Sequence, residues 1–235
     1  MRSNKKRGAV AKIFSPEALL KRRIRAHFKK LGFVKADDGS LIRPGTEKND
    51  VRRLHSGQRA ERLRSGETFL ARALPRTLPH FADGNEIDPA KVQLGLIRVY
   101  SDTREADLFR VATLTWSVPV SPGFGRRLRY LVWDTYHSRL VGVIALGDPV
   151  YNLSVRDNLI GWDVHDRSER LVNVLDAYVL GAVPPYNMLL AGKAVACLVR
   201  SLDVYKDFKT TYGQAVGVQL IALSQVRLNV VSRLS

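Results

Sequence analysis

The chain has 235 residues, of which 45% are hydrophobic and 26% are charged, and this composition is typical of a folded globular protein. Its net charge of +16 is concentrated in residues 1–79, which hold 21 Lys and Arg against 7 Asp and Glu, while residues 80–235 hold 17 against 15. The single Cys197 excludes an internal disulfide and a thiolate metal site, and no uncharged run reaches the ~20 apolar residues of a membrane-spanning helix. We expect a cytoplasmic protein without a membrane partner.

The first predicted helix follows a short basic tail over residues 1–14. Ser15 is a favourable N-cap, Pro16 suits the first helical position, and Gly32 ends the helix. Apolar residues recur along this helix at every third or fourth position, and cations occupy the opposite face. Residues 51–64 repeat the pattern and predict a second basic helix.

A basic helical face is either a solvated surface or a contact for the phosphates of nucleic acid. Its repetition in two helices favours nucleic acid, with DNA as the expected partner. Such a field gives affinity without sequence specificity. The predicted nucleic-acid-binding residues are Lys5, Lys6, Arg7, Lys21, Arg22, Arg25, Lys29, Arg52, Arg53 and Arg59.

Prolines and glycines interrupt the chain between about residues 75 and 90, so we expect a basic helical region over residues 1–79 and a core over residues 80–235. The first element of this core is a predicted strand over residues 94–99. Residues 109–116 fit a helix or a strand equally well.

A β-hairpin is predicted next. Residues 129–134 and 140–146 are rich in β-branched, aromatic and other apolar residues, and the five residues between them suit a turn. Asp166 with Glu169 resembles a capping box and predicts a helix that runs through Leu175.

The last predicted strand covers residues 178–180, and Asn187 is the predicted cap of a helix that runs to about Leu202. Free N–H groups at the start of a helix attract anions. Asn187 and Met188 are therefore the predicted site for an anion or ligand.

The sequence contains no phosphate-binding glycine loop, dinucleotide fingerprint or zinc-protease motif, and it predicts neither a metal nor a cofactor. Asp134, Asp148 and Asp157 each end or follow a predicted strand, where a two-metal nuclease places its ligands. Aspartates in such positions more commonly serve as turn residues.

Arg156 and Asp157, with Trp162 nearby, are the candidate catalytic residues. An arginine beside a carboxylate and an indole can clamp a ligand or a base by charge and stacking. A structural ion pair that covers a buried tryptophan is the commoner use of the same residues.

Residues 125–213 contain, in order, the segments GRRLRYLVWD, LVGVIALGDPVYNLSVRDNLIGW, LVNVLDAYVLGAVPPYNMLLAGKAVACLVRSL and TYG. This order of motifs resembles the DruA family of the bacterial Druantia antiphage defence systems. The segments DVRRLH and LRSGETFLARALP extend the resemblance over most of the chain.

The resemblance implies a role in defence against phage alongside other proteins of the system, among them a large helicase-like component. It also implies a core similar to the acetyltransferase-like fold. Residues 179–188 occupy the place of that fold's pyrophosphate-binding turn, but they lack its glycine pattern and carry two prolines, so acetyl-CoA is not expected. Family members continue well past Tyr212–Gly213, so the chain is either a short variant or a truncated reading frame.

These observations predict an α+β protein with a basic helical N-terminal region and a mixed-sheet core. The predicted function is that of a DruA-like defence component that binds nucleic acid and works with partner proteins. The alternatives are an enzyme with transferase-like or DNA-processing activity, and a transposon-associated helper protein.

Overall fold

A computed structural model describes residues 15–45, 47–189 and 191–213. Contacts within the chain divide it into two compact units, Met1–Gly57 and Gln58–Ser235. The charge changes near residue 79, which lies inside the second unit, so the division by charge and the division by contacts fall at different places.

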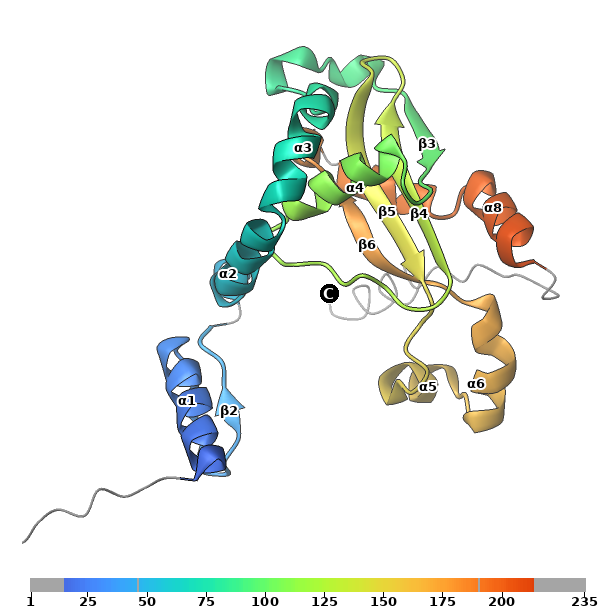
Figure 1. Cartoon of the computed structure of the whole chain (residues 1–235). Coiled ribbons are helices and arrows are strands. Elements are labelled where there is room, and N and C mark those ends of the chain that lie inside the picture. Colours follow the sequence, from blue (N-terminus) through green and yellow to red (C-terminus); the bar gives the residue numbers. More distant parts are fainter. Residues whose placement is uncertain (1–14, 46, 190, 214–235) are drawn as a thin grey trace, which may run out of the picture. The chain divides into compact units, whose positions relative to one another are not determined.

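Eight α-helices and six strands lie in the described residues, together with five short 3₁₀ helices. Figure 1 shows their arrangement. The helices are α1 (Pro16–Lys30), α2 (Lys48–Ser65), α3 (Glu67–Thr77), α4 (Arg104–Leu114), α5 (Ser154–Ile160), α6 (Val164–Arg170), α7 (Ala191–Leu198) and α8 (Leu202–Tyr212). The strands are β1 (Val34–Lys35), β2 (Leu41–Ile42), β3 (Leu94–Arg98), β4 (Arg127–Asp134), β5 (Arg139–Gly147) and β6 (Asp176–Ala182). None of these helices is both long and apolar enough to span a membrane.

The first unit contains α1, the antiparallel hairpin of β1 and β2, and the beginning of α2. Ser15 caps α1 by accepting a hydrogen bond from the Ala18 amide at 3.2 Å, and Gly32 follows the helix with a φ of +86°. The predicted start and end of this helix are therefore confirmed. No side chain of α1 is buried, and both strands of the hairpin are exposed.

The second unit is built on a four-stranded sheet in the order β3–β4–β5–β6. The α+β class is confirmed, but every pairing in this sheet is antiparallel, where the sequence predicted a mixed sheet. The connections explain the difference. Helix α4 and the loop after it return the chain to the end of the sheet where β3 finished, and α5 with α6 do the same between β5 and β6.

Each face of the sheet is covered by helices. Helix α4 lies across one face (Figure 1), and its buried residues Leu108, Phe109 and Ala112 pack on that face. The segment that fitted either a helix or a strand is thus largely helical, because Thr103 caps α4 and its buried residues have helical spacing. Helices α7 and α8 pack on the other face through residues such as Val195 and Phe208.

Two predicted helix starts are wrong. The capping box lies one turn earlier than expected, with Asp163 accepting from the Asp166 amide at 2.9 Å, and α6 ends at Arg170. Asn187 lies inside a 3₁₀ turn over Tyr186–Leu189 and caps no helix. Of the helix expected to run to about Leu202, only α7 forms and it ends at Leu198, and Ser201 then caps the separate helix α8.

Gly142 on β5 has no room for a side chain. A Cβ atom at this position would lie 2.5 Å from the carbonyl oxygen of Gly181 on β6 and 2.9 Å from Val195 Cγ2 on α7. We therefore expect Gly142→Ala to lower the free energy of unfolding by about 1–3 kcal/mol through overpacking, as measured by urea denaturation. Gly192→Ala is the control, because nothing lies within 4 Å of a Cβ there, and an equal loss in both variants would contradict the role of close packing.

Candidate functional site

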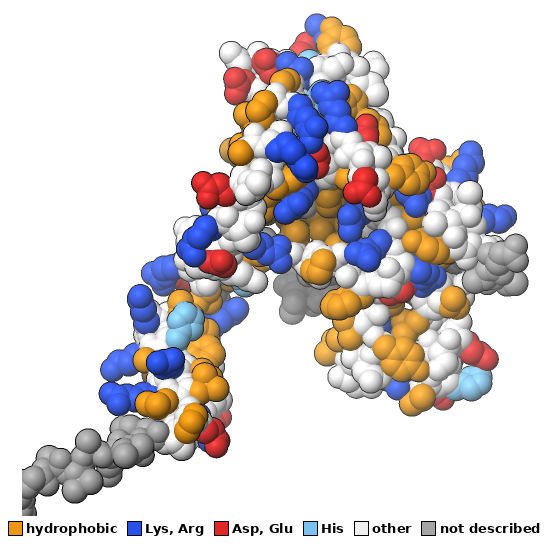
Figure 2. All heavy atoms as spheres, in the orientation of Figure 1, with side chains coloured by type: hydrophobic (Ala, Val, Ile, Leu, Met, Phe, Trp, Pro, Cys, Tyr) orange, Lys and Arg blue, Asp and Glu red, His pale blue; other side chains and the backbone are white. Residues whose placement is uncertain are grey.

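The basic side chains predicted to bind nucleic acid are exposed along α1. Lys21, Arg22, Arg25 and Lys29 all face solvent, and Lys21 forms an ion pair with Glu17 at 2.8 Å. Figure 2 shows the Lys and Arg side chains of this unit, at the lower left, beside hydrophobic ones. Side chains exposed in this way can be reached by phosphate groups from solvent.

The remaining predicted cations fall into three groups. Lys5, Lys6 and Arg7 lie outside the described residues. Arg52 and Arg53 on α2 are exposed, and each donates a hydrogen bond at 3.2 Å to a side chain three residues earlier, Asn49 or Asp50. Arg59 is half-buried and donates from Nε to the carbonyl of Trp116, so it anchors the end of α4 in the second unit.

Arg156 and Asp157, the candidate catalytic pair, form a buried ion pair at the start of α5. They are 7% and 3% exposed, and Arg156 Nε donates to Asp157 Oδ1 at 2.8 Å. The two terminal nitrogens of Arg156 donate to the carbonyls of Val150 and Tyr151 at 2.7 and 2.9 Å. All three nitrogens of this guanidinium are therefore engaged, and it connects the loop after β5 to α5.

A second arginine completes this cluster. Arg167 on α6 donates to the other oxygen of Asp157 at 2.9 Å, and Trp162 lies 5.9 Å from the Arg156 guanidinium. Burial raises the pKa of Asp157, but hydrogen bonds from Arg167 and Arg156 outweigh it and hold the pKa below its usual value. Arg156, Arg167 and Asp157 thus form an ion-paired cluster beside the half-buried Trp162.

Asp134 at the end of β4 is the most enclosed carboxylate in the described residues, with no exposed surface. One of its oxygens, Oδ2, accepts from the Tyr186 hydroxyl at 2.8 Å and contacts His137 Nδ1 at 2.6 Å. The other, Oδ1, accepts from the backbone amides of Gln93, Tyr136 and His137. Burial raises the pKa of Asp134, but these hydrogen bonds lower it below its usual value.

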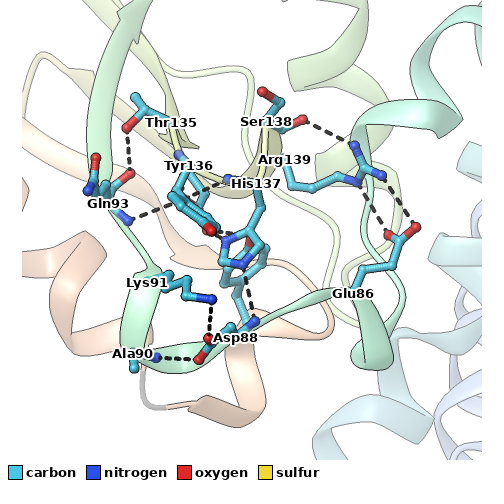
Figure 3. A network of polar contacts seen from close by, with 12 residues as sticks. Glu86, Asp88, Ala90, Lys91, Gln93, Thr135, Tyr136, His137, Ser138 and Arg139 are labelled. Carbon is cyan, nitrogen blue, oxygen red and sulfur yellow. Dashed lines mark hydrogen bonds and ion pairs between the residues drawn. The ribbon is translucent and has the colours of Figure 1, made fainter.

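The hydrogen bond at Nε2 of the His137 ring indicates which of the two ring nitrogens carries the proton. In Figure 3 the ring points toward the segment that carries Asp88, and His137 Nε2 accepts from the Asp88 amide at 3.1 Å. Because an accepting nitrogen carries no proton, the proton lies on Nδ1 and is donated to Asp134. The Asp134 cluster, defined by Asp134, His137 and Tyr186, therefore links the hairpin turn to the segments before β3 and after β6.

The three aspartates that end or follow predicted strands bind different partners and do not share a site. Asp134 binds its own cluster, Asp157 binds two arginines, and Asp148 binds the backbone and guanidinium of Arg126 at 2.9 and 2.7 Å. In the part of the chain that the structure describes, no three His, Cys, Asp or Glu side chains gather as a metal site.

At the predicted anion site, the backbone donors are already used. The Asn187 amide donates to the Val183 carbonyl at 3.1 Å, and the Met188 amide donates to the Pro185 carbonyl at 2.9 Å. The side chain of Met188 is 81% exposed. These two residues therefore form a closed turn.

Sequence reasoning missed the Asp134 cluster and the role of Arg126. The Arg126 guanidinium donates to the carbonyls of Leu171 and Val174, at 3.4 and 3.3 Å, in addition to Asp148. A local signal existed for the cluster, since Asp134 and His137 lie three residues apart across a predicted turn. No local signal exists for Tyr186, which lies about 50 residues after Asp134. The same holds for the carbonyls that Arg126 binds, which lie about 50 residues after Arg126.

The fold and these clusters define an α+β protein with an antiparallel sheet, a basic helical unit and internal polar clusters that hold its loops. A family model described as Druantia protein DruA matches residues 45–234, and the chain belongs to this family. A curated Druantia protein DruA from Escherichia coli (strain UMEA 4076-1) is 57% identical over 212 residues.

That alignment covers 90% of this chain and 52% of the relative, so the chain spans about half the length of the curated protein. No solved structure matches the chain. The likeness to acetyltransferases therefore stays a prediction.

Proposed function

We propose that this member of the DruA family is a nucleic-acid-binding component of a Druantia antiphage defence system and that it works with other proteins of that system. Membership of the DruA family supports the defence role. The observation that carries the nucleic-acid part is the set of exposed cations on α1, a helix that has no buried residue. DNA is the proposed partner.

The affinity is expected to come from phosphates and to depend steeply on salt, because each contact releases condensed counterions. We expect Lys21→Gln, Arg25→Gln and Lys29→Gln, combined in one variant, to weaken binding of labelled duplex DNA. The slope of log affinity against log salt should fall by up to about 2.7 in magnitude, at about 0.9 for each contact. Fluorescence anisotropy over a salt series measures both quantities.

The matched control is the triple variant Arg200→Gln, Lys206→Gln and Lys209→Gln. It removes the same formal charge from exposed positions of the second unit, on or just before α8. If the two triple variants weaken binding equally, net charge and not α1 is responsible. If the wild-type chain binds neither single-stranded nor duplex DNA, the proposed function fails.

The defence role is tested in cells. Plaque assays on bacteria that carry a complete Druantia gene set, with this gene as the DruA copy, should show loss of protection when the gene is deleted. The α1 triple variant should reduce protection and the α8 triple variant should retain it. If both triple variants lost protection, the defence role would not depend specifically on the α1 surface.

The enzyme alternative centres on Arg156, Asp157 and Trp162, and the transposon-associated helper shares the basic region. Arg156 and Asp157 bind each other, and Arg156 also binds two backbone carbonyls, which favours a structural role for the pair. Substitution of Arg156 by lysine distinguishes a structural role from a catalytic one.

A further inference from the structure

Helices α3 and α4 meet along a line of arginine contacts in the second unit. Near the end of α3, Arg76 forms an ion pair with Asp107 of α4. Near the start of α3, the Phe69 ring lies under the guanidinium of Arg110, 3.9 Å from the ring centre. Because each contact joins the two helices, Arg76 and Arg110 lie on one shared surface and their order along it is fixed.

Two further arginines lie on this surface. Arg104 of α4 donates from Nη2 to the Arg76 carbonyl at 3.3 Å and to His80 Nε2 at 2.7 Å, which fixes it beside the end of α3. Arg72 lies four residues before Arg76 and therefore on the same face of α3. Both Arg104 and Arg72 are exposed. Figure 2 shows Lys and Arg side chains gathered over α3 and α4.

A small pocket continues the line where α4 ends. Leu114, in its wall, lies four residues after Arg110 and so on the same face of the helix. Arg59 and Arg62 are half-buried, and each donates one hydrogen bond to a backbone carbonyl of the loop after α4, at 3.3 and 2.6 Å. A guanidinium has five N–H donors, so each keeps donors for a ligand. The pocket is lined by Arg59, Arg62, Leu63, Thr113, Leu114, Trp116 and Pro119, with no carboxylate among these residues.

The arginines along this line suit a chain of phosphates. Arg104 and Leu114 are separated by about 15 Å along α4, at 1.5 Å for each residue, which matches the rise of about four nucleotides in one strand of a duplex. A guanidinium binds phosphate oxygens in pairs, and packing or hydrogen bonds already restrain most of these side chains, so binding costs less side-chain entropy. The arginine seam is defined by Arg59, Arg62, Arg72, Arg76, Arg104 and Arg110, against the three carboxylates that α3 and α4 supply, Glu67, Glu105 and Asp107.

We propose that the arginine seam binds the phosphate backbone of nucleic acid and that the pocket between Arg59 and Arg62 takes one of its phosphates. The inference rests on the proposed function and adds a second contact, in the unit that contains the sheet. A single small anion would occupy only the pocket, whereas a nucleic acid strand would also use the cations of α3 and α4. Nucleic acid is therefore the ligand that fits the whole length of the seam.

The test is binding of a labelled DNA duplex by the full chain over a salt series. We expect Arg72→Gln, Arg104→Gln and Arg110→Gln, combined in one variant, to weaken binding at least about 10-fold at about 0.1 M salt. The slope of log affinity against log salt should fall by up to about 2.7 in magnitude, at about 0.9 for each contact. Arg62→Gln alone should lower the slope by about 0.9 if the pocket holds a phosphate.

Urea denaturation checks that each variant is folded under the binding conditions. If the triple variant is unstable, Arg72→Gln alone replaces it, because this exposed side chain can be changed without disturbing the packing of α3 on α4. The expected fall in slope is then about 0.9. An unchanged slope in a folded Arg72→Gln variant would count against the seam.

The matched control is the α8 triple variant, Arg200→Gln, Lys206→Gln and Lys209→Gln. It removes the same formal charge, and α8 packs on the opposite face of the sheet from α4. If the wild-type chain binds DNA with a salt dependence and the seam variant keeps the full slope, the arginine seam is overturned and the proposed function stands. An equal loss in the seam and α8 variants would also overturn the seam. If the wild-type chain binds no nucleic acid, both proposals fail.

Discussion

Replacing Asp134 with Ala is expected to lower the free energy of unfolding by about 3–5 kcal/mol, the loss that follows removal of one partner from a buried charged cluster. The carboxylate has no exposed surface, and its removal leaves the Tyr186 hydroxyl, His137 Nδ1 and several amides without an acceptor. Urea denaturation followed by tryptophan fluorescence measures the loss.

The same residue predicts how stability depends on pH. Hydrogen bonding holds the folded-state pKa of Asp134 below its unfolded value. The contribution is therefore complete above about pH 4, where the unfolded carboxyl is ionised, and it is lost as the pH falls through the lower folded-state pKa. Asp134→Ala should reduce the loss of stability that the wild-type chain shows in acid.

Asp134→Asn is a sharper variant because it keeps the shape of the side chain. Its amide group would meet the donors of His137 and Tyr186, and the ring cannot exchange its proton freely because Nε2 accepts from Asp88. Asp203→Asn, at an exposed position in the first turn of α8, is the control and should cost less than about 1 kcal/mol. Equal unfolding midpoints for the two asparagine variants would show that the cluster does not hold the fold.

Elements with strong local signals could be predicted from the sequence. Ser15 and Pro16 mark the start of α1 by their own chemistry, and β4 and β5 pair across a short turn. The position of Asn187 could not be predicted in this way. Its amide is taken by the Val183 carbonyl, and that choice depends on how the chain leaves β6 and not on residue type.

The residues of the candidate site differ in the same way, because some could be predicted from local sequence and others could not. The exposed cations of α1 follow from amphipathic spacing, because a surface helix must turn its charged residues to solvent. The bonding of Arg156 does not follow, because its backbone partners can be known only after the loop before α5 has folded.

Arg156→Lys is expected to lower the free energy of unfolding by about 3 kcal/mol, although the charge is kept. The guanidinium of Arg156 binds Asp157, the Val150 carbonyl and the Tyr151 carbonyl with separate nitrogens. An ammonium group at the end of a flexible chain cannot reach all three partners in the same geometry. The carbonyls of Val150 and Tyr151 would then lose their donors, and chemical denaturation would detect the loss.

Arg170→Lys is the matched control in the adjoining helix. Arg170 forms an ion pair with Asp166 at 2.9 Å, but its side chain is 59% exposed, so lysine should replace it at a cost below about 1 kcal/mol. A large loss only in Arg156→Lys would establish that the buried pair holds the α5 region together. If Arg156→Lys instead kept full stability and lost nucleic-acid binding or processing, the pair would act on a ligand, and the catalytic interpretation of Arg156, Asp157 and Trp162 would be the correct one.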